Sequence, residues 1–155
     1  MEKDFWYEDS CHGNVEDRQI QFIESSIGVT LPKKYIDLVK VCDGGCPRRE
    51  DFKYFNEYRK SYSISGIGGF LFLNNSKYSD FLEEFKSPPE FFPQGLIAFA
   101  DTGGGDLICF DYRQGKDNLD PPIVYWSHGG EEGKDVSFIA KNFEEFIGML
   151  YEPED

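Results

Sequence analysis

The sequence predicts a single α+β domain over residues 1–155, in which helices from both chain ends pack on a mostly antiparallel sheet. Apolar residues keep helical spacing in the first third of the chain and at its end, whereas the middle holds strand-length runs rich in branched and aromatic residues. Two of these runs are joined by a glycine turn. Strands grouped between helices, without regular strand–helix alternation, argue against a parallel sheet.

The strongest strand signal is the pair of runs at 96–100 and 107–112, which are apolar at neighbouring positions as well as alternating ones. Strands of this kind are usually covered on both faces. Residues 101–106 link them with three consecutive glycines, which can adopt the positive φ angles of a tight turn, and with an Asp at each shoulder. We therefore expect a central antiparallel hairpin with Phe99 and Phe110 buried.

The other elements follow from periodicity and from helix-end signals. Helices are expected after a capping box of Asn14 and Asp17, ending at Gly28; from Leu31-Pro32 to Asp43-Gly44-Gly45; from Ser76 or Ser79 to Pro88-Pro89; and from Asn142 to Leu150. Further strands are expected within 64–73, 123–126 and 136–140, the later ones forming a meander. Residues 1–12 are expected to pack on the body as a short helix or arm, and 46–63 form a connection of unassigned structure.

The charge of the chain restricts its partners. Acidic side chains number 29 against 16 basic ones, a formal charge of -13, so most of the surface repels a polyanion such as nucleic acid. A basic protein partner fits better, although acidity that serves only solubility is an equal alternative. The sequence has no apolar run long enough to span a membrane and starts without a secretion signal, so we expect a cytoplasmic protein.

Four cysteines, at 11, 42, 46 and 109, are expected to be reduced thiols, two of them within apolar patterns. Cys11, His12, Cys42 and Cys46 form the one possible zinc set, but their spacing does not match a zinc ribbon or finger. We therefore expect no metal and no cofactor.

The glycine turn and its neighbours offer two further candidates for a chemical site. No Lys, Ser or Thr follows Gly103–Gly105 as in a phosphate-binding loop, and Asp101 and Asp106 would repel phosphate. Acid–base chemistry by Asp101, Asp106, Asp111 and His128 lacks a nucleophile with a matched base. The residues thus indicate no enzyme.

The order of these motifs resembles the SUKH superfamily, which includes bacterial immunity proteins and a fungal regulator of cell-wall synthesis. The matching pieces are Ile27-Gly28-Val29, Leu31-Pro32, Tyr35, Asp43-Gly44-Gly45, the hairpin residues Ala98, Asp101, Gly104 and Asp106, and Asn142-Phe143. The resemblance covers most of the chain and implies an α+β fold without enzymatic activity. Asp43 stands where this pattern often has Asn, and residues 46–63 match nothing in it.

The resemblance implies an immunity protein that neutralises a bacterial toxin domain by direct binding, with a nuclease as the toxin it most often implies. A regulatory scaffold related to the cell-wall regulator is the alternative, and an unrecognised hydrolase is a third. The carboxylates expected on loops and helix ends, available to a basic partner, are Asp101, Asp106, Glu131, Glu132, Glu144 and Glu152.

Overall fold

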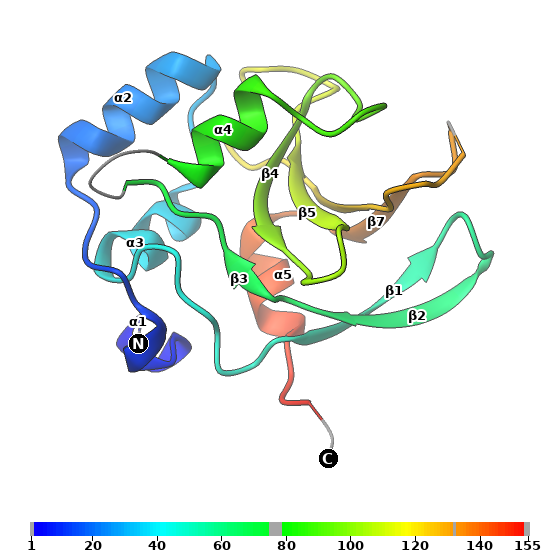
Figure 1. Ribbon diagram of the computed structural model, residues 1–155, viewed down its shortest axis with the longest axis horizontal. Helices are drawn as coiled ribbons and strands as arrows, with labels where there is room; N and C mark the ends of the chain where they lie inside the picture. Colours follow the sequence, from blue (N-terminus) through cyan, green and yellow to red (C-terminus); the bar gives the residue numbers. More distant parts are fainter. Residues whose placement is uncertain (1, 75–78, 132, 154–155) are drawn as a thin grey trace.

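The strands form two antiparallel sheets (Figure 1). The computed structural model describes residues 2–74, 79–131 and 133–153. The five-stranded sheet has the order β3-β4-β5-β6-β7, with β3 at Gly69–Phe70, β4 at Leu96–Asp101, β5 at Leu107–Asp111, β6 at Ile123–Trp126 and β7 at Val136–Ala140. The second sheet pairs β1 (Asp51–Asn56) with β2 (Ser61–Gly66). The α+β class and the meander of the last four strands are confirmed.

The described residues form six short helical segments: α1 (Glu2–Phe5), the 3-10 turn η1 (Glu8–Ser10), α2 (Asp17–Ile27), α3 (Lys33–Val41), α4 (Asp80–Lys86) and α5 (Phe143–Met149). Three predicted helix ends are confirmed. Gly28 ends α2 at a φ of +78°, and the side chains of Ser79 and Asn142 cap the N-termini of α4 and α5. Within the described ranges, no helix is long and apolar enough to cross a membrane.

The predicted capping box of Asn14 and Asp17 is wrong. The N-cap of α2 is Glu16, which forms the box with Gln19. The amide of Val15 donates to the carbonyl of Lys40 at 3.2 Å, so the chain is held against the end of α3 at this point and the helix begins later than predicted.

The predicted hairpin lies at the centre of the five-stranded sheet, with Asp101 paired to Leu107 across the turn. Phe99 and Phe110 are fully buried and stack with ring centroids 4.3 Å apart. Tyr35 of α3 and Phe143 of α5 pack against both rings at 5.1 to 6.0 Å. This aromatic cluster joins two helices to the sheet and fixes the position of the hairpin turn.

The N-terminal arm is fastened to α3 in two ways. Trp6 is buried and its Nε1 donates to the carbonyl of Leu38 at 3.1 Å. Cys11 and Cys42 are joined by a disulfide, so the expectation of four reduced thiols is wrong, and Cys46 and Cys109 are the free cysteines. Their pairing depends on the arm lying against the end of α3, which sequence spacing does not reveal. Two members of the zinc set are therefore bonded to each other.

Residues 46–63, unassigned from the sequence, supply β1 and the start of β2. Figure 1 shows this hairpin at the side of the molecule opposite α2. The strand expected within 64–73 is divided, because Ile67 donates its amide to the carbonyl of Glu50, just before β1, and Gly68 donates to Asp101 in the large sheet. The chain thus passes from one sheet to the other at these residues.

Candidate partner-binding surface

The six carboxylates predicted from the sequence lie in different parts of the molecule. Asp101 and Asp106 flank the β4–β5 turn, and Glu131 is exposed in the connection between β6 and β7. Glu144 is exposed in the first turn of α5, and Glu152 shares a shallow cleft with Arg48 and Arg49. Glu132 lies outside the described residues. Asp106 contacts His128 at the start of the connection that holds Glu131, and the contact of these carboxylates with a partner stays a prediction.

Asp106 has a structural role at the hairpin turn. One carboxylate oxygen accepts from the Tyr125 hydroxyl at 2.6 Å, and the other accepts from the His128 amide at 2.9 Å and lies 2.5 Å from its Nδ1. Burial, and then the bond to Asp106, raises the pKa of Tyr125. Asp106 thus connects the turn to the end of β6. In the described part of the chain, the His128 ring is bonded to Asp106 and to no Ser, Thr or Cys side chain.

Asp101 belongs to a different group, with Asp80 and Glu84 of α4. Burial raises the pKa of all three carboxyls, and the charge of Asp80 raises the pKa of Asp101 and Glu84 further. A cation beside these three carboxyls would lower their pKa again, because its attraction stabilises their charged form. Asp80 and Glu84 were not predicted from the sequence, since carboxylates along a short helix are ordinary.

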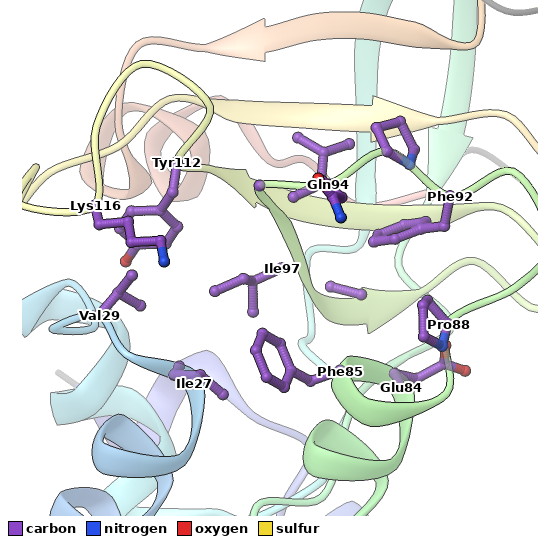
Figure 2. Close-up of a pocket in the computed structure, with 14 residues that line it drawn as sticks. Ile27, Val29, Glu84, Phe85, Pro88, Phe92, Gln94, Ile97, Tyr112 and Lys116 are labelled. Carbon is purple, nitrogen blue, oxygen red and sulfur yellow. The ribbon is translucent and has the colours of Figure 1, made fainter.

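A cleft of about 490 Å³ opens beside this carboxylate group, between the end of α2, α4 and the start of β4 (Figure 2). Its apolar lining includes Ile27, Phe85 and Ile97, whose side chains point into the same space in Figure 2. Glu84 and Lys116 line opposite sides. An apolar floor with charges of both signs at its edge is suited to an apolar side chain from a partner.

The segment Phe91-Phe92-Pro93 separates this cleft from a second one of about 840 Å³, which also includes Arg113 and Asp135. Phe92 packs on Trp126 with ring centroids 5.1 Å apart, which anchors the segment. Phe91 is 85% exposed and has a φ of +68°. Exposed aromatic rings beside apolar clefts are typical of protein interfaces, so the geometry here favours binding.

Comparison with known proteins identifies a family and a relative. Residues 14–149, which include every element from α2 to α5, match the model of the SMI1 / KNR4 family (SUKH-1). The chain is also 29% identical over 147 residues to the SPbeta prophage-derived uncharacterized protein YokK of Bacillus subtilis (strain 168). That alignment covers 85% of this chain and 72% of YokK. The matched family region includes Cys42 but begins after its disulfide partner Cys11.

Proposed function

Because the chain belongs to the SMI1 / KNR4 family (SUKH-1), we propose that it is a non-catalytic immunity protein that neutralises a bacterial toxin domain by direct binding. The family match over residues 14–149 carries this proposal, since immunity proteins are a main group of the superfamily that the sequence resembles. Similarity to a prophage-derived protein of a bacterium is in keeping with this role. The toxin acts inside the cell, so the immunity protein works in the cytoplasm.

The proposed toxin is a nuclease, whose active site needs Lys and Arg side chains to hold phosphate. A chain of charge -13 attracts such a site over long distances and accelerates association. We assign the first contact to Asp80, Glu84 and Asp101, because burial raises the pKa of all three, the charge of Asp80 adds to this at Glu84 and Asp101, and a nearby cation would offset both effects. Phe91, at the edge of the adjoining clefts, then serves as the apolar anchor.

Neutralisation of a toxin is the direct test. Expression of the product of a neighbouring toxin-like gene should arrest growth, and co-expression of this chain should restore growth and co-purify with the toxin. Phe91→Ala should weaken the complex more than tenfold, the loss typical of an interface anchor, through faster dissociation. Failure of this chain to bind or to rescue would overturn the immunity proposal.

Electrostatic steering is tested by the association rate. The rate should fall steeply between 0.1 M and 1 M salt, as the Debye length falls from about 10 Å to about 3 Å. The double substitution Asp80→Asn with Glu84→Gln should slow association, whereas Glu8→Gln with Asp9→Asn removes the same charge from η1 and should change it less. Joint neutralisation of Glu131 and Glu132 should lower the association rate more than it raises dissociation if they lie at the rim. A rate that does not depend on salt would eliminate steering and leave the immunity proposal intact.

A further inference from the structure

The outer edge of β2 is an unprotected strand edge. Among the described residues, β2 has β1 as its single strand neighbour. Its sequence, Ser61 to Gly66, contains no charged residue and no proline, which are the usual protection of such edges. Tyr62 and Ile64 are 68% and 64% exposed. An exposed, uncharged edge with apolar side chains readily pairs with another strand.

The hydrogen-bond pattern shows which backbone groups are available. Ile67 donates its amide to the carbonyl of Glu50, which lies directly opposite it. Hydrogen-bonded pairs alternate along an antiparallel ladder, so Phe52 with Ser65 and Tyr54 with Ser63 also bond within the hairpin. The alternate residues, Tyr62 and Ile64, therefore point their amides and carbonyls away from β1. On β1 the same alternation directs Asp51 outward, and Asp51 exchanges both backbone bonds with Tyr151 at 3.0 Å. The corresponding groups of Tyr62 and Ile64 face the outer side of β2.

Charge distinguishes this hairpin from the rest of the molecule. The hairpin, residues 51–66, carries three basic and two acidic side chains, a net charge of +1, which leaves -14 on the remainder. A basic toxin is attracted to the remainder and gains nothing from the hairpin. Two copies of the chain repel each other through their acidic parts, and pairing through the hairpin, which has little net charge, adds little to this repulsion.

We propose that β2 pairs with β2 of a second copy about a two-fold axis through Ser63. This pairing places Tyr62 opposite Ile64 of the second copy, and each such pair exchanges both backbone hydrogen bonds. It also extends a row of side chains on one face, where Phe55 already contacts Tyr62 at 5.3 Å and Lys53 lies 5.2 Å over the Tyr62 ring. Aromatic side chains opposite branched ones stabilise neighbouring strands. The inference concerns self-association and does not depend on the proposed function.

The expected dimer is weak. Two six-residue edges and their side chains cover less than the roughly 800 Å² per partner of a stable complex, so monomer and dimer exchange with concentration. The position of the hairpin, opposite α2 in Figure 1, keeps the axis away from the cleft between α2 and α4. Both copies thus keep that cleft open for a partner.

Sedimentation equilibrium of the full chain over a range of concentrations tests the pairing. Ile64→Lys should weaken self-association at least about tenfold, because a lysine at this edge blocks strand pairing. Phe22→Lys is the matched control, since Phe22 is 63% exposed on α2 and should have little effect. Self-association should strengthen with salt, the opposite of toxin binding, because salt screens repulsion between the copies.

Cross-linking tests the axis independently of the folding of any lysine variant. Under mild oxidation, Ser63→Cys should give a covalent dimer through residue 63, identified by mass spectrometry, and Ser25→Cys on α2 should not. A chain that stays monomeric at every concentration overturns the proposal. So does a dimer that Ile64→Lys leaves unchanged, or one that does not cross-link at residue 63.

Discussion

The disulfide between Cys11 and Cys42 should make a large contribution to the stability of the fold. Its partners are 31 residues apart. In the chain-entropy account, closing a loop of that length restricts the unfolded chain by about 3 to 4 kcal/mol at 25 °C. Because the net stability of a domain is typically about 5 to 15 kcal/mol, loss of the bond should be visible in any unfolding experiment.

Urea denaturation with and without a phosphine reductant measures this contribution. With a urea slope of about 2 kcal/mol per M, the reductant should lower the wild-type midpoint by roughly 1.5 to 2 M. The double variant Cys11→Ala with Cys42→Ala should start at the lower midpoint and show no response to reductant. Cys46→Ala, which removes a free thiol, should respond as the wild type does.

Alkylation and mass spectrometry give the matching covalent evidence. In urea without reductant, Cys46 and Cys109 should be alkylated, and Cys11 and Cys42 should be alkylated only after reduction. A wild-type midpoint that does not move on reduction, or four reactive thiols in unreduced protein, would refute the proposed covalent link between the arm and α3.

Three further changes test the core and its carboxylates. Phe99→Ala should lower the free energy of unfolding by about 3 to 5 kcal/mol, whereas Phe138→Ala, at a side chain 57% exposed, should change it little by the same urea assay. Tyr125→Phe should cost about 1.5 kcal/mol, because the Asp106 carboxylate loses a partly buried donor; an unchanged midpoint would show that this bond is dispensable. Glu84→Gln should stabilise the protein at pH 7. The folded-state pKa of Glu84 is raised, so the wild type gains stability as the pH falls, and the advantage of Gln should vanish below the ordinary carboxyl pKa of 4.5. A pH-independent difference would contradict the raised pKa.

Elements with a strong local signal were predictable from the sequence. The glycine turn after Asp101, the helix end at Gly28 and the cap at Asn142 each depend on one or two residues whose backbone preference is strong. The hairpin β1–β2 has no such signal. Its outward-facing Phe55 and Tyr62 are as apolar as the inward-facing Phe52, which hides the alternation that normally identifies a half-buried strand.

The candidate site was less predictable because it is assembled from distant segments. The expectation of carboxylates on loops and helix ends included Asp101. It did not include its neighbours Asp80 and Glu84, because their proximity to Asp101 depends on how α4 packs beside β4. The clefts on either side of Phe92 form only when that ring reaches Trp126. Likewise, the Cys11–Cys42 pairing follows from tertiary structure.

At position 91, selection for stability and selection for toxin binding should favour different residues. Left-handed φ angles cost an aromatic residue about 1 to 2 kcal/mol, and at 85% exposure the ring recovers little of this by burial. A library of variants at this one codon, sorted for resistance to proteolysis, should therefore enrich Gly and Asn. The same library sorted for protection of cells against the toxin should keep Phe.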